Sequence, residues 1–210
     1  MGTPTIKIFV LSHEQTLLDL APNGPEFEKI NLSSLDIGPY QSNQLGECRA
    51  FFRDFSDVDA EYIGFANARW NQKYFRLKTR LETLPYHVER LAAPGWVLAP
   101  WPAYDWVKLT LHHHPSMEPL VSELIQIMAL SPNNDHVSLW ANDFICHRSV
   151  FFDWLKFWKT TFEHFYGRYG LDLPFDIAGT DPSRKSAFFF ERVTTAYFAN
   201  RPDVRIAPFE

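Results

Sequence analysis

Cysteine is scarce in this sequence. Cys48 and Cys146 are the only two among 210 residues. Two cysteines cannot form the disulfide framework of a small secreted domain, and their wide separation does not match a zinc site. The N-terminus carries only one Lys and the short apolar run Ile6–Leu11, without the apolar core and cleavage site of a signal peptide. Both absences favour a reduced, cytoplasmic setting.

Long hydrophobic runs and an excess of positive charge are absent as well. No apolar run approaches the ~20 residues needed to cross a bilayer, so no membrane span is expected. The formal net charge of -5 gives no electrostatic reason to expect a nucleic-acid partner. The 46% hydrophobic content is typical of a globular interior, and the length suits a single domain over residues 1–210.

Common catalytic and metal-binding motifs are missing too. The sequence has no glycine-rich phosphate loop, no nucleophile elbow and no spaced pair of Cys or His ligands. The run His112–His114 looks like a metal site, but three consecutive helical positions point in three directions, which favours a solvated helix end. Asp57 and Asp59 form an Asp-x-Asp triplet, but they precede a predicted strand rather than follow one. A connecting loop is the favoured interpretation.

The chain instead alternates short apolar strands with helices. Strands are predicted at Ile6–Leu11, Tyr62–Ala66, Gly95–Ala99, Asp143–Cys146 and, at an edge, Val204–Ala207. Helices are predicted at Leu45–Phe55 with Asn43 as cap, Ala103–His113, Glu118–Leu130 and Ala187–Ala199 with Ser186 as cap. This alternation is typical of an α/β layered domain with a mainly parallel sheet flanked by helices.

One more helix has the clearest periodicity. At 100° per residue, its large apolar residues fall within a stripe of about 120°, which predicts an amphipathic helix. The stripe consists of Phe151, Trp154, Leu155, Trp158, Phe162, Phe165 and Tyr166. We expect it to pack into the core, whereas Phe152 and Phe157 fall outside it.

Polar side chains stand directly against apolar runs at two places in the last third of the chain. Asn142 and Asp143 precede a predicted strand, and Glu191 and Arg192 follow the run Phe188–Phe190. Burying such groups without partners costs roughly 1–3 kcal/mol each. We therefore expect them to contact one another or a ligand.

Three further residues follow predicted strands. His13 comes after the first strand, and Asn67 and Arg69 come after the second. In α/β sheets, ligands bind beyond the carboxyl ends of the strands. We expect these residues to converge with Asn142 and Asp143 at one cleft.

Several short motifs then occur in order along the chain. They are His13; Asn43 and Glu47 in Asn43–Phe52; Asn67-Ala68-Arg69-Trp70 after a strand; His114-Pro-Ser-Met-Glu-Pro-Leu; Asn142-Asp143-Phe144; and Phe190-Glu191-Arg192. Taken together, this series resembles a bacterial family of glycosyltransferase-like domains from capsule and surface-polysaccharide gene clusters. Two departures stand out. The family's His-Tyr-Arg-Arg motif is Asn67-Ala68-Arg69-Trp70 here, so Arg69 is the one cation where the family carries two. In the later motif, Asp143 replaces a Met.

The resemblance implies a GT-A-like nucleotide-sugar fold. The first strand and its following loop would hold the nucleotide, and later segments would shape the side that binds a carbohydrate acceptor. The reaction would displace a nucleoside diphosphate from a sugar. It needs positive charge or a metal on the departing diphosphate, and a carboxylate base if the configuration inverts. No acidic pair follows a strand, so no metal ligand is predicted, although Mn²⁺ or Mg²⁺ remains compatible with this chemistry.

Roles follow for the candidate residues. Glu191 and Asp143 are the candidate catalytic residues, with Glu191 preferred as base because the preceding apolar run would raise its pKa. The candidate substrate-binding residues are His13, Asn67, Arg69, Trp70, Asn142 and Arg192. The candidate aromatic platforms for a sugar are Trp70, Trp101, Trp106 and Trp140.

Structural alternatives stay open for several of these residues. Arg69 either clamps a diphosphate or forms a salt bridge at a strand end. His13 either contacts a ligand or is a bonded turn residue. Glu47 is more easily read as a helix residue that pairs with Arg49 or Arg69.

Two functions follow from these observations. The first is a glycosyltransferase that uses a nucleotide sugar in surface-polysaccharide assembly. The alternative is a non-catalytic descendant of the fold that binds a sugar, a nucleotide or a partner protein. The altered His-Tyr-Arg-Arg motif favours the second function, and the retained Glu47, Asn142 and Glu191-Arg192 favour the first.

Overall fold

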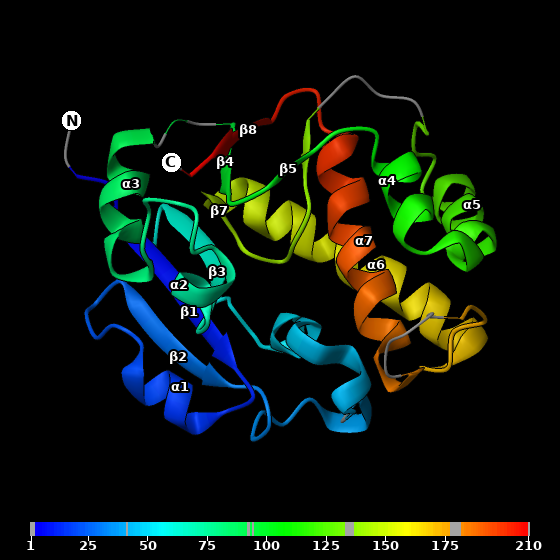
Figure 1. Ribbon diagram of the computed structural model, residues 1–210, viewed down its shortest axis with the longest axis horizontal. Coiled ribbons are helices and arrows are strands. Elements are labelled where there is room, and N and C mark those ends of the chain that lie inside the picture. Colours follow the sequence, from blue (N-terminus) through cyan, green and yellow to red (C-terminus); the bar gives the residue numbers. More distant parts are fainter. Residues whose placement is uncertain are drawn as a thin grey trace.

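A six-stranded sheet organises the protein, as the computed structural model in Figure 1 shows for residues 3–40, 42–91, 93, 95–132, 137–176 and 182–209. Its strand order is β2-β1-β3-β7-β4-β8. The strands are β1 (Ile6–Ser12), β2 (Phe27–Asn31), β3 (Tyr62–Asn67), β4 (Trp96–Ala99), β7 (Phe144–His147) and β8 (Arg205–Pro208). Of these six strands, β7 alone runs antiparallel to its neighbours. The predicted α/β class with a mainly parallel sheet is confirmed.

Seven helices and a small second sheet complete the described elements. The helices are α1 (Gln15–Leu20), α2 (Trp70–Lys73), α3 (Leu84–Leu91), α4 (Trp106–His113), α5 (Glu118–Ile127), α6 (Arg148–Tyr169) and α7 (Lys185–Ala199). Short 3₁₀ segments are η1 (Gly38–Tyr40), η2 (Asn43–Phe52), η3 (Leu81–Thr83), η4 (Pro115–Met117) and η5 (Pro182–Arg184). The strands β5 (Pro102–Ala103) and β6 (Ser138–Leu139) pair antiparallel.

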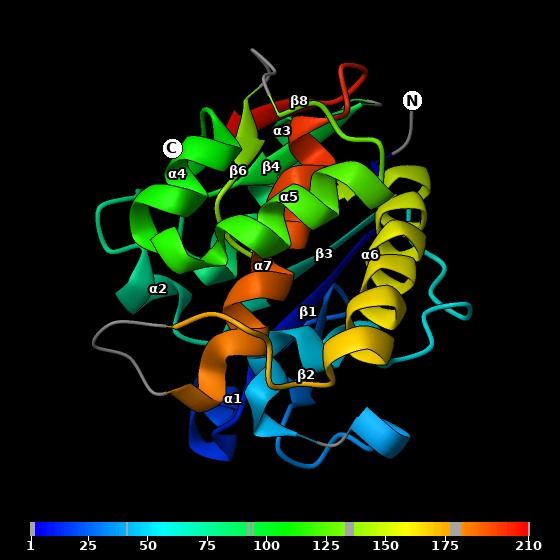
Figure 2. The same cartoon turned by 90° about the vertical axis from the view of Figure 1, so that its right-hand side faces the viewer.

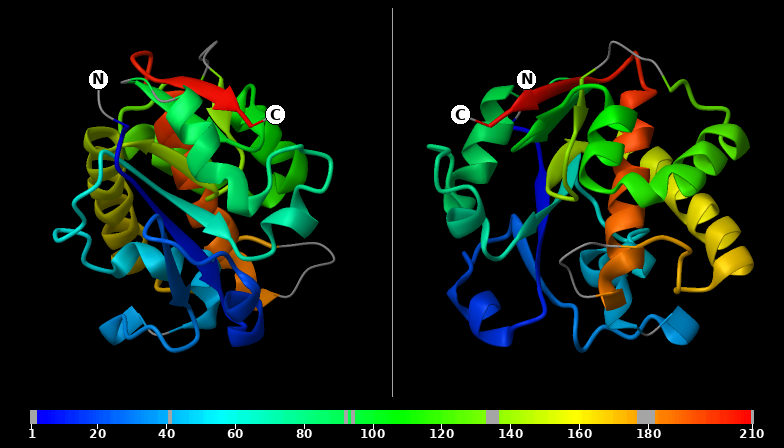
Figure 3. Two further views of the ribbon diagram at one scale, coloured as in Figure 1. Left: turned by 90° about the vertical axis from the view of Figure 1, so that its left-hand side faces the viewer. Right: turned by 45° about the vertical axis from the view of Figure 1, so that its right-hand side comes forward.

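The sheet is covered on both faces because side chains alternate along each strand. On β1, Phe9 and Leu11 join one core with residues of α6 and α7, whereas Ile8 and Val10 join a second core with residues of α1 and α3. Figure 3 shows α3 on one side of the sheet and α6 and α7 on the other. A strand buried on both faces reads as a continuous apolar run, which explains why β1 was predicted from its sequence.

A close approach of two strands at the centre of the sheet depends on Gly64. A Cβ atom at this position would lie 2.1 Å from the carbonyl oxygen of Phe144 on β7. The glycine therefore lets β7 lie against β3, with Gly64 opposite Ile145 in the register. This contact ties the first half of the chain to the segment that carries Asn142 and Asp143.

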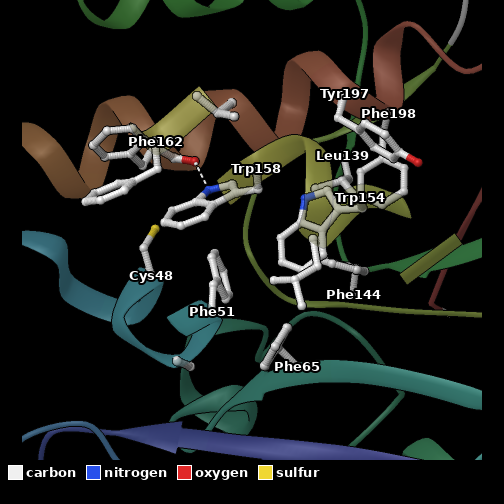
Figure 4. Close-up of a cluster of buried hydrophobic side chains, with 14 of the residues drawn as sticks. Cys48, Phe51, Phe65, Leu139, Phe144, Trp154, Trp158, Phe162, Tyr197 and Phe198 are labelled. Atoms are coloured by element: carbon white, nitrogen blue, oxygen red, sulfur yellow. Dashed lines mark hydrogen bonds between the residues drawn. The ribbon is translucent and has the colours of Figure 1, made fainter. Parts of the chain in front are cut away.

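The apolar stripe of α6 fills the larger core, as predicted. Trp154 and Trp158 are fully buried and meet Phe51 edge-to-face at ring-centroid distances of 4.9 and 5.0 Å. The indole nitrogen of Trp158 donates a 3.1 Å hydrogen bond to the Phe190 carbonyl of α7 (Figure 4). Phe152 and Phe157, outside the stripe, are partly buried against the same core.

Two details of the predicted helices were wrong. The segment expected as an α-helix from Leu45 is the 3₁₀ segment η2, interrupted at Gly46 with φ of 53°, and its cap is Ser42, whose hydroxyl accepts from the Gln44 backbone N–H. A left-handed residue breaks the hydrogen-bond ladder, so an α-helix cannot continue through it. Ser186 is a buried residue inside α7 rather than its cap, and its hydroxyl donates to the Leu171 carbonyl.

The elements α1, β2, α2, α3, β5 and β6 were not predicted, and the helix expected from Ala103 begins at Trp106 because Ala103 belongs to β5. The unpredicted elements are short or lie at the edge of the sheet, and β2 is only partly buried, so their sequences lack a continuous apolar run. No helix in the described part of the chain has the length and apolar character needed to cross a membrane.

Candidate active site

Two cavities adjoin at the edge of the sheet where β1 and β3 end. The aromatic cavity, about 590 Å³, is lined by Glu47, Cys48, Asn67, Arg69, Gln72, Lys73, Trp101, Trp140, Ala141, Asn142, Arg184, Ala187, Phe188 and Glu191. The strand-end cavity, about 470 Å³, is lined by Ser12, His13, Glu14, Leu32, Ser33, Gly46, Glu47, Asn67, Arg69, Ser183 and Arg184. Four residues belong to both walls, namely Glu47, Asn67, Arg69 and Arg184. We call this shared wall the junction.

Strand direction explains why these residues meet. His13 and Asn67 lie at the carboxyl ends of the parallel strands β1 and β3. Because β7 runs the other way, its amino end reaches the same edge and brings Asn142 with it. The amino-terminal part of α7 packs against η2, as Figure 2 shows. Of the five residues expected to converge, Asn67, Arg69 and Asn142 line the aromatic cavity, His13 lines the strand-end cavity, and Asp143 lines neither.

Asp143 lies beneath the junction and lines neither cavity. Its Oδ1 accepts from the Asn67 backbone N–H at 2.7 Å, and its Oδ2 accepts from Lys73 Nζ at 2.7 Å and from the Tyr74 hydroxyl. The side chain is 2% exposed. With both oxygens bonded to protein groups, Asp143 holds the end of β3 and the Lys73 side chain. The position does not fit the predicted catalytic role.

The charges of this buried network are mutually stabilised. Burial lowers the pKa of Lys73, but the carboxylates of Asp143 and Glu47 outweigh it and raise that pKa overall. Burial and the Asp143 carboxylate likewise raise the pKa of the Tyr74 hydroxyl, which therefore stays protonated as a donor. Lys73 remains a cation on the wall of the aromatic cavity.

Glu47 is the titratable carboxyl at the junction. Burial raises its pKa to about 7, with further contributions from the negative charges of Asp143 and Glu191, against the opposing effect of Lys73. Its Oε1 accepts a hydrogen bond from Asn67 Nδ2. The pairing with Arg49 considered from the sequence is not the one observed, since the Arg49 guanidinium donates to the Leu35 carbonyl at 3.0 Å.

Two cations lie at the junction, where the sequence indicated one. Arg69 is half-exposed and forms an ion pair with Glu14. Arg184, whose guanidinium carbon lies 5.2 Å from the centroid of the Phe188 ring, lines both cavities. Arg184 thus adds a second cation beside the one that the motif at Asn67–Trp70 retains. Arg184 was missed because it comes from η5, far from Arg69 in sequence.

Glu191 and Arg192 occupy different positions although they are adjacent. Glu191 lines the aromatic cavity and forms an ion pair with Arg192. Arg192 is 2% exposed and lines neither cavity, and its guanidinium carbon lies 3.4 Å from the centroid of the Trp140 ring. The predicted substrate contact by Arg192 does not fit this burial. Its contacts make it a support for Trp140.

The candidate tryptophans also separate. Trp70 is 1% exposed, donates from its indole nitrogen to the Thr79 carbonyl at 3.1 Å, and packs against Phe209 in the second core. Trp70 is therefore a core residue, which corrects its predicted role in substrate binding. Trp106 is also buried, whereas Trp101 and Trp140 line the aromatic cavity.

His13 lines the strand-end cavity with its side chain exposed. Partial burial and the positive charges of Arg49 and Arg184 lower its pKa, so the ring is neutral near pH 7 and offers one donor and one acceptor. Its backbone carbonyl accepts from the Ser33 hydroxyl at 2.9 Å, which fixes the loop after β2 against the end of β1.

Within the described residues, no three His, Cys, Asp or Glu side chains are arranged to hold a metal ion. The His112–His114 run lines neither cavity at the junction, and Asp57 and Asp59 are exposed at a loop before β3. The positive charge available to an anionic ligand here therefore comes from Arg69, Arg184 and Lys73.

Similarity to known proteins is confined to structure. No protein-family model and no curated protein matches the sequence. The chain is similar in fold to a solved structure described as the WbbM bifunctional glycosyltransferase in its apo form, with a TM-score of 0.56 and 12% sequence identity. The likeness covers 98% of this chain and 45% of that chain, so this chain spans less than half of that protein. At this identity the comparison establishes a glycosyltransferase-like fold.

Proposed function

We propose that the protein transfers a sugar from a nucleotide-sugar donor to a hydroxyl group of a carbohydrate acceptor. The observation that carries this proposal is the junction, where a carboxyl with a pKa raised to about 7 lies between two cavities and beside two arginines. A glycosyltransferase-like fold supports the same conclusion. The order of motifs along the chain supports a role in surface-polysaccharide assembly.

The donor nucleotide would occupy the strand-end cavity. That cavity lies beyond the carboxyl end of β1, where α/β sheets bind their ligands. Arg69 and Arg184 would bind the two phosphates through charge-assisted hydrogen bonds, for which a planar guanidinium is well suited. His13 and Ser33 would contact the nucleoside.

The sugar would then project through the junction into the aromatic cavity, where the acceptor binds. In the transfer step, Glu47 takes the proton from the acceptor hydroxyl, whose oxygen forms a bond to the anomeric carbon. The bond from that carbon to the diphosphate oxygen breaks, and the departing diphosphate keeps the electron pair beside Arg69 and Arg184. Direct displacement of this kind inverts the configuration at the anomeric carbon.

The chemistry of Glu47 suits this step. A general base works best when its pKa lies near the working pH, since it is then ionised yet still accepts a proton. Fixed cations at the site of developing negative charge stabilise the transition state without reorganisation. Glu191 also lines the cavity, but it is neutralised by the adjacent Arg192, so Glu47 replaces it as the preferred base.

A panel of uridine, guanosine and deoxythymidine diphosphate sugars tests the proposal. Wild-type protein is expected to show a thermal shift with one class and to hydrolyse or transfer its sugar. Glu47→Gln should keep the thermal shift and lose turnover at least a hundredfold, whereas the control Glu89→Gln, at an exposed position of α3, should keep both. Binding without turnover in wild type would favour the non-catalytic alternative. Failure of every nucleotide to bind would contradict the proposed transfer.

A further inference from the structure

The part of the aromatic cavity beyond the junction is walled by three aromatic side chains, Trp101, Trp140 and Phe188. Trp101 immediately precedes β5 and Trp140 immediately follows β6. Because Pro102 pairs with Leu139 in the register of these strands, Trp101 and Trp140 lie next to each other across the end of one small sheet. A backbone hydrogen bond from Trp140 N–H to the Trp101 carbonyl, 3.0 Å long, fixes their spacing.

Trp101 is the wall residue open to a ligand. Its side chain is 42% exposed, although a tryptophan gains more free energy from burial than most residues. Its ring stands edge-to-face against Tyr74, with centroids 4.8 Å apart, and the Tyr74 hydroxyl is held by Asp143. The indole is therefore positioned by the buried network before any ligand binds.

Trp140 is held in place from behind. The buried guanidinium of Arg192 lies over the ring at 3.4 Å, and the His113 ring lies against it with centroids 5.4 Å apart. A desolvated cation–π contact of this kind is stronger than one exposed to solvent. Arg192 thus acts as a positioning residue, and Trp140 forms a rigid part of the cavity wall beside Trp101.

The polar groups of this part of the cavity include two donors, Gln72 and Lys73, and two residues that offer acceptor oxygens, Asn142 and Glu191. Asn142 is 3% exposed, and its Oδ1 has no hydrogen-bond partner among the described residues, while its Nδ2 has only the Cys48 sulfur at 3.4 Å. Glu191 lines the same part of the cavity, and Glu47 lies next to it at the junction. An unpaired buried carbonyl destabilises the folded protein, and a hydrogen-bond donor from a ligand would remove that penalty.

We propose that this part of the cavity is a binding subsite for a pyranose of the acceptor, stacked on Trp101 and recognised through its hydroxyl groups by Asn142 and Glu191. The apolar C–H face of a pyranose covers an exposed indole, and its hydroxyl donors match the acceptors of the wall. The assignment of this pyranose to the acceptor rests on the proposed function, but binding of the sugar requires neither a donor nor turnover.

The test measures equilibrium binding of free sugars by ligand-observed NMR and by tryptophan fluorescence. The probes are the methyl glycosides of a neutral hexose and an N-acetylhexosamine. A neutral glycoside is expected to bind saturably. Trp101→Ala should weaken the neutral glycoside at least tenfold. The matched control Tyr104→Ala removes an aromatic side chain that is 67% exposed and outside this cavity, so binding should be unchanged.

A second variant separates recognition from folding. Asn142→Leu removes the unpaired carbonyl, so its melting temperature should equal or exceed that of wild type, while its affinity for the neutral glycoside falls about tenfold. The proposal is overturned if neither glycoside binds, or if Trp101→Ala binds like wild type. These outcomes leave the nucleotide thermal shift untouched, so they are distinguishable from failure of the proposed glycosyl transfer.

Discussion

The pKa of Glu47 leads to a prediction about stability that needs no substrate. In the folded protein this pKa is about 7, against an ordinary value of 4.5. Between these two values the unfolded chain has released the proton of Glu47 while the folded chain still holds it. The folded state therefore loses stability as the pH rises from about 4.5 to about 7, and the full loss is present above that range. Glu47→Gln cannot ionise, keeps an oxygen for Asn67 Nδ2, and escapes this loss.

The magnitude follows from the same shift. A change of about 2.5 pKa units at about 1.36 kcal/mol each would destabilise the ionised form by roughly 3 kcal/mol. Glu47 is only partly buried, and solvent screening reduces this figure. We therefore expect the free energy of unfolding of Glu47→Gln, relative to wild type, to increase by about 1–3 kcal/mol between about pH 4 and about pH 8.

Urea unfolding of both proteins at these two pH values measures the difference directly. Glu89→Gln is the matched control, because Glu89 is exposed on α3 and its difference from wild type should stay the same at both pH values. A difference between Glu47→Gln and wild type that does not grow with pH would refute the raised pKa. It would also remove the reason for preferring Glu47 as the base.

Three further outcomes are expected. Arg69→Ala should lower turnover by about 10²–10³-fold, as expected for the loss of a charge at a developing anion. Its melting temperature should change little, because the exposed ion pair of Arg69 with Glu14 is worth only about 0–1 kcal/mol. A large fall in melting temperature with normal turnover would show a structural role for Arg69. Nucleotide binding should persist in EDTA, because Arg69, Arg184 and Lys73 supply the positive charge; affinity that is lost in EDTA and restored by Mn²⁺ would contradict this. Lys73→Met should destabilise the fold by about 3–5 kcal/mol in thermal or urea unfolding, since it leaves the buried Asp143 carboxylate without its cation; unchanged stability would show that the tyrosine and backbone donors suffice.

The parts of the fold that could be predicted from sequence are those with a strong local pattern. The stripe of α6 and the apolar run of β1 each identify their element without reference to the rest of the chain. The 3₁₀ geometry of η2 could not be predicted in this way. The local sequence favours a helix, and the interruption at Gly46 comes from the positive φ that this glycine adopts in the fold. Helix propensity is a weak preference that tertiary context overrides.

The candidate site was predicted as a region rather than as a set of roles. His13, Asn67 and Asn142 were expected near a cleft because they lie beside predicted strand ends, and all three line the cavities. Adjacency in sequence was misleading for Asp143, which was grouped with Asn142, although neighbouring residues at the start of a strand point in opposite directions. The same applies to Trp70, which follows Arg69 but begins α2 and faces the other core.

The roles of Glu47 and Lys73 required the three-dimensional arrangement. The pKa of Glu47 depends on Asp143, Lys73 and Glu191, which come from three other segments of the chain. No spacing within the sequence of η2 carries this information. The signal available beforehand was the motif order, which named Glu47 but gave no reason for its charge state.

The reversed strand β7 also has a consequence for the order of folding. It separates β3 from β4, so the two parallel parts of the sheet, β2-β1-β3 and β4-β8, are joined only through a strand from the last third of the chain. Pairing Phe65 with Phe144 closes a long loop, and contacts of large sequence separation form slowly because of their entropy cost. While the chain is being synthesised, neither the continuous sheet nor the wall with Asn142 can exist before β7 emerges. The cavities are then among the last features to form, so the incomplete chain has no place where a donor sugar could bind.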